Sequence, residues 1–578
     1  MKFRKSIIAA LCGAVAFASC SDKMDYREVS VYDEDYVKTT FSRTGGLISQ
    51  IYTYLESDFG NYNGAVMGSA TDESVYTRTG NSVQGFYNGA WGPTNNLDGG
   101  RWSKCWAGIS YANLFLDEFN NEKFLEYQTD LKNYKAEMFQ YNNFKFEARA
   151  LRAYYYFELV RMFGDVPLKT TSLDAASSNA LPRVPADEIF KFIDDECVAI
   201  KDSIVKDYAK IADENGISMN LGGKVESGRV NNLFVLALRA RAALYHASPL
   251  FNPNNDKELW RKAVEANQEL IVACTTRGMK LNADYSALFG TDNWSNAIEC
   301  IFVRRNISAS NNFEKYNFPL GMGNANGANC PTQNLVDAYE MKNGKAIDEE
   351  GSGYDAQNPY ADRDNRLSYT VAVNGEMWPS SNTNALQTYI GGMHHGSAVS
   401  YGTNTGYYLK KYVNNSTIIS GSQENSFRHH WVIFRLGEFY LNYAEAILNY
   451  TGSGYDKSNY KWTAAEALNV VRKRAGQPDV AEGLDFEHFK QKYENERFVE
   501  LAFEGHRFYD VRRWKEANKY FTSIRKMDIV KNEDDTFTYT PGVLETRQWS
   551  DNMYLFPLSQ SEILKSGGSL VQTTGWAK

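Results

Sequence analysis

The sequence lacks several features that would each indicate a class of protein. It has no Cys-x-x-Cys pair, and the apolar run at residues 7–17 has eleven residues, too few to cross a bilayer. Basic residues form no run outside the extreme N-terminus, and the net charge is −8. Because nucleic-acid binding needs a basic surface, we expect no nucleic-acid partner.

Cysteine and histidine are too sparse to predict a disulfide framework or a metal site. The adjacent pairs His394–His395 and His429–His430 point in different directions on any regular element, and no carboxylate completes a ligand set. We therefore expect no required metal and no cofactor. Five cysteines beyond the N-terminal segment are odd in number and irregularly spaced, and we expect small buried thiols at all of them: Cys105, Cys197, Cys274, Cys300 and Cys330.

The N-terminus has the parts of a lipoprotein signal peptide. Basic residues precede the apolar run, and small residues precede Cys20 in the segment FASC, which resembles a bacterial lipobox. We expect residues 1–19 to be removed, Cys20 to be lipidated and residues 20–40 to form a tether. The following SDKMD resembles the stretch that sends lipoproteins of Bacteroidetes-type bacteria to the cell surface. We expect a surface-exposed outer-membrane lipoprotein; an ordinary secretory signal is the alternative.

Helical periodicity dominates two regions on either side of a looser middle. Residues 142–163 place apolar side chains on one face, and Gly164 and Pro167 then end the helix. This alternation of helices and short connections predicts a mainly α-helical fold of stacked, tetratricopeptide-like hairpins. Further helical patterns cover residues 185–204, 228–249, 256–273, 434–450 and 464–476.

Two segments rich in glycine and asparagine, about residues 61–100 and 278–427, interrupt the helical pattern and contain only short strand-like or loop-like stretches. Long loops in a compact body commonly carry function, so we predict a binding site between the two segments. We expect a single domain over residues 41–578, with a helical frame at about 41–60, 101–277 and 428–515.

Residues 496–514, ERFVELAFEGHRFYDVRRW, combine an apolar stripe with many charges. The spacing predicts one amphipathic helix that faces the core, with Arg497 paired with Glu500 and Glu504 with Arg507. A glycine inside this helix, Gly505, suggests the close approach of another backbone. Because no nucleophile lies nearby in the sequence, we interpret the segment as scaffold.

Six segments together resemble the SusD/RagB family of surface nutrient-binding lipoproteins, and they occur in the family's order. The resemblance implies a SusD-like helical frame of four tetratricopeptide-like hairpins that performs no chemistry. It also implies that the protein acts as a lid on a SusC-like TonB-dependent transporter and contacts the transporter through its N-terminal hairpins. The lid would deliver captured oligosaccharide or polysaccharide to the transporter. The segments are EARALRAYYYFELVRMFGDVPL, GRVNNLFVLALRARAALYHASPLFN, YDAQNPYADRDNRLSYTV, FRLGEFYLNYAEAILNY, ERFVELAFEGHRFYDVRRW and YLFPLSQSEI.

The resemblance also implies where cargo binds. Family members that bind starch carry sugar-stacking aromatics and an amide after a Thr-Asp-Glu turn, and here Tyr76 and Asn81 stand at such positions. Arg78 stands where a second aromatic would be, which argues against a starch-like specificity. An aromatic ring can cover the C–H face of a sugar while polar side chains bond its hydroxyls. We therefore predict ligand contacts for these three residues together with Asp72 and Trp91; a capped turn and a core tryptophan are the structural alternatives.

The second loop-rich segment contributes three more predicted ligand-binding residues. Asn312, Tyr316 and Asn329 lie in or just after a stretch rich in asparagine and glycine. We expect them to close the other side of a groove, although the same composition also serves turns.

Two alternatives have different observable consequences. A peptide-binding, RagB-like member of the family would present a groove with exposed backbone partners instead of an aromatic platform. A surface glycoside hydrolase would use Glu500 or Glu504 as an acid, with another carboxylate roughly 5 to 9 Å away. That acid would lie in an open cleft and have a raised pKa.

Overall fold

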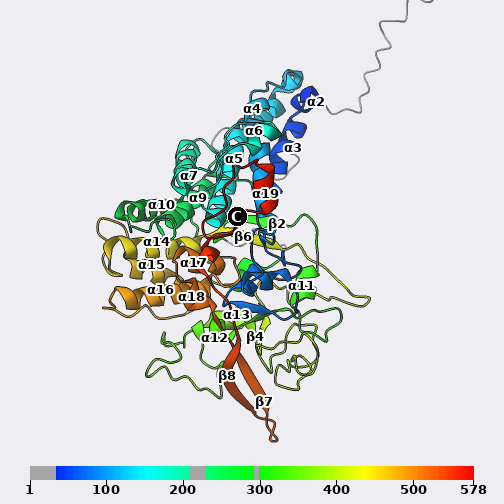
Figure 1. The fold of residues 1–578 in the computed structure, drawn as a ribbon, viewed down its shortest axis with the longest axis vertical. Helices are drawn as coiled ribbons and strands as arrows, with labels where there is room; N and C mark the ends of the chain where they lie inside the picture. The colour runs from blue at the N-terminus through cyan, green and yellow to red at the C-terminus, as the bar shows by residue number, and fades with distance from the viewer. Residues whose placement is uncertain (1–33, 209–227, 292–297, 578) are drawn as a thin grey trace, which may run out of the picture.

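The computed structural model describes residues 34–208, 228–291 and 298–577. The predicted signal peptide and Cys20 lie outside these residues. Helices account for 43% of the structure and strands for 11%, which confirms the mainly helical prediction. The helices form a curved stack, and the loop-rich segments lie below it with the β7–β8 hairpin at the lower end (Figure 1).

In the stack, each long helix packs against the next long helix along the chain. α4 packs on α5, α5 on α7, α7 on α9, α9 on α10 and α10 on α14, which also contacts α15 and α16. This succession is what helical hairpins produce when each pair buries its apolar face on the next. The long helices are α3 (Phe41–Tyr52), α4 (Arg101–Glu118), α5 (Leu131–Phe163), α7 (Ala186–Ile200), α9 (Asn232–Ala247), α10 (Lys257–Thr276), α14 (Leu436–Thr451), α15 (Ala464–Ala475) and α16 (Phe486–Glu500).

Local sequence explains where several of these helices begin and end. The Thr463 hydroxyl accepts a hydrogen bond from the Glu466 N–H, and the Glu466 carboxylate accepts one from the Thr463 N–H, so α15 begins with a capping box. It ends at Gly476, whose φ of +78° suits glycine. α9 ends two residues before Pro249, as its sequence predicts.

Shorter elements occupy the connections and the loop-rich segments. The short α-helices are α2 (Glu34–Lys38), α6 (Ala175–Asn179), α11 (Asn312–Asn317), α12 (Gln333–Ala338), α13 (Asn365–Thr370), α17 (Arg507–Arg513), α18 (Ala517–Phe521) and α19 (Gln560–Lys565). The 3₁₀ turns are η1 (Met67–Ala70), η2 (Ser82–Phe86), η3 (Leu125–Thr129), η5 (Ser286–Phe289) and η7 (Asp551–Tyr554).

Four antiparallel strand pairs connect segments that are mostly far apart in the sequence. β1 (Ser74–Tyr76) pairs with β3 (Asn329–Pro331), and β2 (Cys300–Arg305) pairs with β6 (His430–Arg435). β4 (Val371–Ala372) pairs with β5 (Tyr408–Leu409), and β7 (Ser523–Lys531) with β8 (Phe537–Thr546). The β1–β3 pair joins the two loop-rich segments, as a site between them requires.

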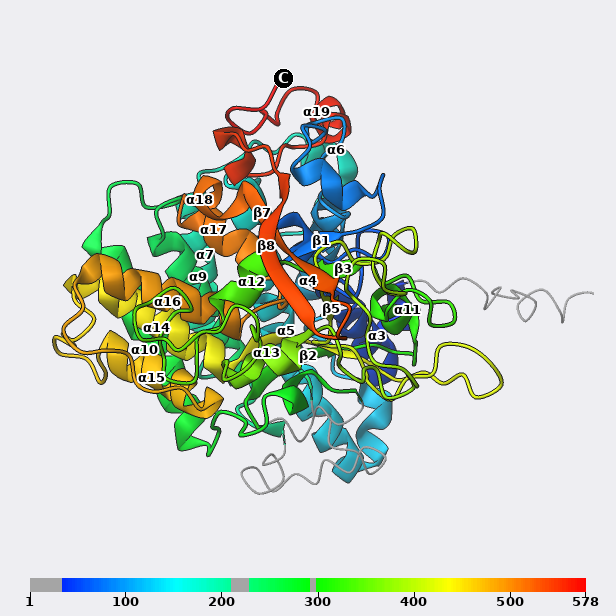
Figure 2. The same cartoon turned by 90° about the horizontal axis from the view of Figure 1, so that it is seen from below.

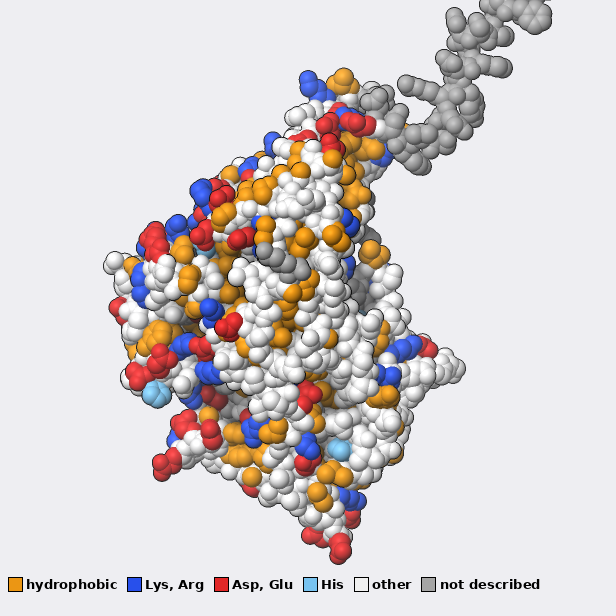
Figure 3. All heavy atoms as spheres, viewed as in Figure 1, with side chains coloured by type: hydrophobic (Ala, Val, Ile, Leu, Met, Phe, Trp, Pro, Cys, Tyr) orange, Lys and Arg blue, Asp and Glu red, His pale blue; other side chains and the backbone are white. Residues whose placement is uncertain are grey.

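The β7–β8 hairpin is an element that the helical reading of the sequence did not include. Viewed from below, it crosses the loop-rich face beside α12 (Figure 2). Its turn contains Glu533, Asp534 and Asp535, and acidic side chains gather at this lower tip (Figure 3).

The prediction of one helix over residues 496–514 is wrong. α16 ends at Glu500 and α17 starts at Arg507, with Phe503 and Gly505 between them at φ values of +59° and +77°. Such backbone cannot continue a right-handed helix, and it explains the glycine better than the close approach of another chain segment. An added Cβ at Gly505 would meet its nearest neighbour, Trp431, at an ordinary 3.6 Å.

The break gives the charges of this segment distant partners instead of the neighbours that helical spacing predicts. Arg497 bonds Asp510 at 2.7 Å, and Arg507 bonds Asp72 at 2.7 Å. The Glu500 carboxylate forms ion pairs with Arg366 at 2.8 Å, with Arg435 at 2.7 Å and with Arg474. The charges are therefore paired and buried as predicted for scaffold, but through tertiary contacts.

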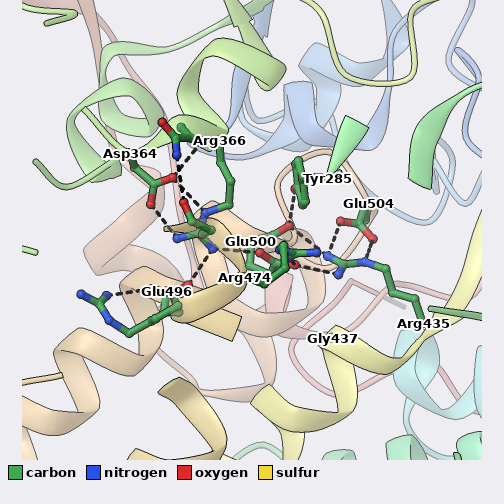
Figure 4. Close-up of polar contacts among 12 residues, drawn as sticks. Tyr285, Asp364, Arg366, Arg435, Gly437, Arg474, Glu496, Glu500 and Glu504 are labelled. Atoms are coloured by element: carbon green, nitrogen blue, oxygen red, sulfur yellow. Dashed lines mark hydrogen bonds and ion pairs between the residues drawn. The ribbon is translucent and has the colours of Figure 1, made fainter. Parts of the chain in front are cut away.

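Arg435 is the hub of this buried network (Figure 4). Its guanidinium bonds Glu299 at 2.8 Å, Glu500 at 2.7 Å and Glu504 at 2.7 and 2.8 Å. It also donates to the Glu500 carbonyl at 3.0 Å. A Cβ at Gly437 would lie 2.5 Å from Arg435 Nη1 and 2.7 Å from Glu299 Oε1, so the network leaves room only for glycine there.

Most of the cysteines are buried, as the sequence predicts. Four of them are buried and Cys300 is half-buried, and all five are free thiols. Burial raises the pKa of the Cys105 thiol to about 12, so this thiol stays protonated and unreactive.

Replacing Arg435 with methionine is expected to lower the free energy of unfolding by about 3 to 5 kcal/mol, because three buried carboxylates lose their shared cation. Urea denaturation measures the change. Lys191→Met removes an exposed ion pair with Asp195 and is the control, with no measurable change expected. An effect of Arg435→Met as small as that of the control would contradict a structural role for the network.

Candidate functional site

The two loop-rich segments meet at the β1–β3 pair, where Tyr76 lies opposite Asn329. The turn before β1 is fixed to the helical frame by two acidic side chains. Asp72 forms a two-bond ion pair with Arg507, at 2.9 and 2.7 Å, and the Phe503 N–H donates to Glu73 Oε1 at 3.0 Å. The break between α16 and α17 therefore supplies the anchors for the segment that precedes the predicted site.

Four of the predicted ligand-binding residues are interior residues, which corrects their assignment. Asp72 is 4% exposed and its carboxylate is used by Arg507. Trp91 is 5% exposed, packs against Phe556 and donates its indole N–H to the Asn96 carbonyl.

Tyr76 and Asn329 are equally enclosed. Tyr76 is 3% exposed and its hydroxyl donates to the Asn63 carbonyl at 3.0 Å. Asn329 is fully buried; its amide donates to Gly64 and its oxygen accepts from the Val66 N–H. Burial and satisfied hydrogen bonds make these four residues parts of the core that supports the loops.

The other four predicted residues reach the surface. Asn81 is half-buried and caps η2, with its amide N–H₂ donating to the Tyr62 carbonyl at 2.8 Å. Asn312 is exposed at the start of α11, and its backbone N–H donates to Ser310. Arg78 and Tyr316 are half-buried.

Arg78, Asn326 and Tyr401 form a surface that we call the Arg78–Tyr401 surface. Arg78 Nη2 donates to Asn326 Oδ1 at 2.8 Å, and its guanidinium lies 5.2 Å from the centre of the Tyr401 ring. The Thr77 hydroxyl donates to the Tyr401 carbonyl at 3.0 Å. The Asn326 N–H donates a hydrogen bond to the carbonyl of Lys315, which precedes Tyr316 in α11.

Tyr401 has the features of a binding residue that sequence reasoning missed. Its side chain is 44% exposed, and its φ is +70°, a conformation that is uncommon for an aromatic residue. The surrounding sequence, SYGTNTG, is rich in turn residues, so the pattern alone gave no sign of the ring's position.

Tyr316 makes a close contact with the turn at Gly64. A Cβ at Gly64, where φ is +94°, would lie 2.8 Å from both the Tyr316 ring and the Tyr76 hydroxyl. Glycine is therefore needed at this turn, and Tyr316 packs directly on its backbone.

Glu500 and Glu504 are unsuited to the hydrolase alternative. Glu500 is completely buried and Glu504 is 6% exposed. Burial alone would raise the pKa of Glu504, but the charges of Arg435 and Lys411 outweigh it and lower the pKa. An acid catalyst needs the opposite shift and an open cleft.

The paired histidines have separate structural roles. His429 Nε2 lies 2.8 Å from Glu314, and His430 Nε2 lies 3.0 Å from the Leu288 carbonyl. His394 accepts a hydrogen bond from the Gln387 N–H, and His395 contacts Ser397. Across residues 34–208, 228–291 and 298–577, no three His, Cys, Asp or Glu side chains gather in a way that could hold a metal ion. In the same ranges, no helix has the length and apolar character needed to cross a membrane.

Two family models match this chain. The model of the SusD family matches residues 299–576, and one described as starch-binding and associating with the outer membrane matches residues 25–210. Two curated relatives come from Formosa agariphila. SusD-like protein P2 is 24% identical over 387 residues, which are 65% of this chain and 66% of that protein. SusD-like protein P25 is 22% identical over 442 residues, 72% of this chain and 69% of that protein. The chain thus spans about two thirds of each relative's length.

Solved structures share the fold. A SusD-like protein from Bacteroides fragilis superposes with a TM-score of 0.75 at 22% identity, covering 94% of this chain and 98% of that one. A SusD-like carbohydrate-binding protein from Bacteroides fragilis gives a TM-score of 0.71 at 20% identity, covering 92% and 99%. At this identity the likeness establishes the architecture.

The buried carboxyl of Glu73 is expected to make stability depend on pH. Burial raises the pKa of Glu73 to about 8, against about 4.3 in an unfolded chain. Between these values the folded protein holds a proton that the unfolded chain releases, so the free energy of unfolding falls as pH rises. Glu73→Gln keeps an acceptor for the Phe503 N–H and cannot titrate.

Urea denaturation at a series of pH values from about 5 to 8 measures the slope. We expect a smaller loss of stability with rising pH in Glu73→Gln than in the unmodified protein. Glu533→Gln, at the exposed tip of the β7–β8 hairpin, is the control and retains the full slope. Equal slopes for all three proteins would show that Glu73 is ionised in the fold.

Proposed function

The chain belongs to the SusD/RagB family, and from that membership we propose that it is a cell-surface glycan-binding lipoprotein. It captures oligosaccharides and delivers them, as a lid, to a SusC-like TonB-dependent outer-membrane transporter. Binding involves no chemical step. Glycan binding is supported by the starch-binding family model and by a carbohydrate-binding structural neighbour.

The Arg78–Tyr401 surface carries the proposal for this chain. An exposed tyrosine ring can lie against the C–H face of a sugar, while a guanidinium and an amide beside it bond neighbouring hydroxyls. Arg78 and Asn326 already bond each other, so their donors are positioned before cargo arrives and little side-chain freedom is lost on binding. The surface lies on the loop-rich part of the molecule, and the helical stack supports it.

A separate apolar surface supports contact with a transporter. Leu125, Tyr127 and Leu131 follow α4 and begin α5, and they are 65%, 40% and 65% exposed. Exposed apolar side chains gathered in one place are typical of protein interfaces. The connection between α4 and α5 lies among the N-terminal hairpins, at the end of the molecule opposite the β7–β8 hairpin (Figure 1). A lid docked there would leave the Arg78–Tyr401 surface free to collect cargo.

Tyr401→Asn is expected to weaken glycan binding about tenfold or more, because it removes the ring but suits the left-handed backbone. Isothermal titration with a panel of plant, host and microbial oligosaccharides and a peptide digest gives the affinities. Tyr369→Ala removes a ring of similar exposure, 43%, elsewhere on the protein and is the matched control. Trp91→Ala should act differently, lowering stability as a core truncation does.

The outcomes of this titration separate the alternatives. Heat from one glycan class that Tyr401→Asn abolishes supports the proposal. Heat from peptides alone would favour the peptide-binding alternative, and newly released reducing ends would overturn the absence of catalysis. Equal affinities for Tyr401→Asn and Tyr369→Ala would remove the Arg78–Tyr401 surface as the binding site.

Cys20→Ala is expected to release the protein from the membrane, because the acylated thiol is the proposed anchor. Fractionation of cells and detection in the soluble and membrane fractions measures the change. Cys105→Ala is the control, since that cysteine is buried in the fold and should not affect retention. Unchanged membrane retention of Cys20→Ala would contradict the lipidation site.

A further inference from the structure

A cavity of about 300 Å³ lies between α4, the segment after α5 and the C-terminal helix α19. We call it the α4–α19 cavity. In both ribbon views α6 and α19 lie close together (Figures 1 and 2). Its walls include Trp102, Trp106, Lys169, Ser178, Leu181 and Glu562. None of these belongs to the Arg78–Tyr401 surface.

Lys169 is the unusual member of this cavity. It is 7% exposed, and its ammonium donates to the Ser178 hydroxyl at 3.0 Å. Within the described ranges no carboxylate forms an ion pair with it, and burial lowers its pKa. A buried ammonium without a counter-charge is costly, so a fold that retains one beside an accessible cavity leaves it available for an anion.

The backbone of Lys169 is also held in place. The Lys169 N–H donates to the Tyr156 hydroxyl at 2.7 Å, and the Asn113 amide donates to the Lys169 carbonyl at 3.1 Å. Both partners come from long helices, α4 and α5. The residue therefore has a fixed backbone and three ammonium donors, of which Ser178 uses one.

The other charged groups at the cavity neutralise each other. Glu562 bonds Lys565 at 2.6 Å, and the Trp102 indole N–H donates to Glu562 at 3.3 Å. The residues that line the cavity therefore carry one net positive charge, that of Lys169. A bound anion would meet one positive group in the wall, Lys169, that has no carboxylate partner.

The remaining walls suit a small ring with one apolar face. Trp102 and Trp106 lie edge to face, with ring centres 5.6 Å apart, and Trp106 is half-buried. Ser103, Ser110 and Asn179 are exposed and supply hydroxyl and amide groups around the opening. Indole faces cover sugar C–H groups, and the rim groups can bond hydroxyls.

We propose that the α4–α19 cavity binds a sugar residue that carries a carboxylate, a hexuronic acid, with the carboxylate on Lys169. A neutral sugar would gain the ring and hydroxyl contacts but would leave the ammonium without a counter-charge. The site is separate from the Arg78–Tyr401 surface and does not depend on the cargo proposed for it. It would give the protein a second point of attachment for acidic glycans.

Isothermal titration of the purified protein with galacturonate and glucuronate, compared with galactose and glucose, tests the proposal. We expect saturable binding of at least one uronate and at least tenfold weaker binding of both neutral sugars. Lys169→Met should weaken uronate binding at least tenfold. Its melting temperature should be unchanged or higher, because it removes a buried charge that has no counter-ion. Lys565→Gln, at the rim of the same cavity, is the matched control and should change affinity little.

A second variant keeps the test decisive if Lys169→Met folds poorly. Leu181→Trp fills the cavity from its half-buried edge and leaves Lys169 intact, and it should also abolish uronate binding. Tyr401→Asn should bind uronate as the unmodified protein does. Equal affinities for uronates and neutral sugars, undiminished binding by a folded Lys169→Met or Leu181→Trp, or loss of binding in Tyr401→Asn would each overturn the proposal.

Discussion

The fold depends on the burial of Glu500 among three arginines. A carboxylate removed from water needs a full set of partners, and Glu500 obtains them from β6, from α13 and from the end of α15. Burial alone would raise its pKa, but the charges of Arg474, Arg435 and Arg366 outweigh that effect and lower it. One ionised side chain thus holds together elements from the looser middle and from the C-terminal helices.

The same constraint positions the surface that we assign to cargo. α16 ends at Glu500, and the left-handed residues after it turn the chain so that Glu504 reaches Arg435 from the other side. This turn presents the Phe503 N–H to Glu73, and α17 then presents Arg507 to Asp72. The loop that carries Arg78 follows directly. Asp72, which the sequence suggested as a ligand group, and Glu500 and Glu504, which it suggested as catalytic acids, therefore have structural roles. Their ion pairs hold the loops that carry the exposed groups.

Local signals were sufficient to predict the helices but not the site. Helices α5, α9 and α15 could be predicted because periodicity, capping residues and terminal prolines or glycines all lie within the segment. The break at Gly505 could not, since a glycine at helical spacing fits either conformation and buried partners decide between them. Burial of Tyr76 and Trp91 is equally non-local: it depends on β3 and on Phe556. Tyr401 and Lys169 stand in ordinary surroundings in the sequence, and only the tertiary contacts distinguish them.

Comparison with two other buried cations of this protein shows what is unusual about Lys169. Arg435 is surrounded by carboxylates, and Arg363, which lacks one, donates to the carbonyls of Val336, Tyr339 and Pro359. Both solutions satisfy the donors of the cation within the chain. The Lys169 ammonium has one hydrogen-bond partner, the Ser178 hydroxyl, and Lys169 lines a cavity. Because no carboxylate in the described ranges pairs with Lys169, a ligand in the cavity can supply the missing counter-charge.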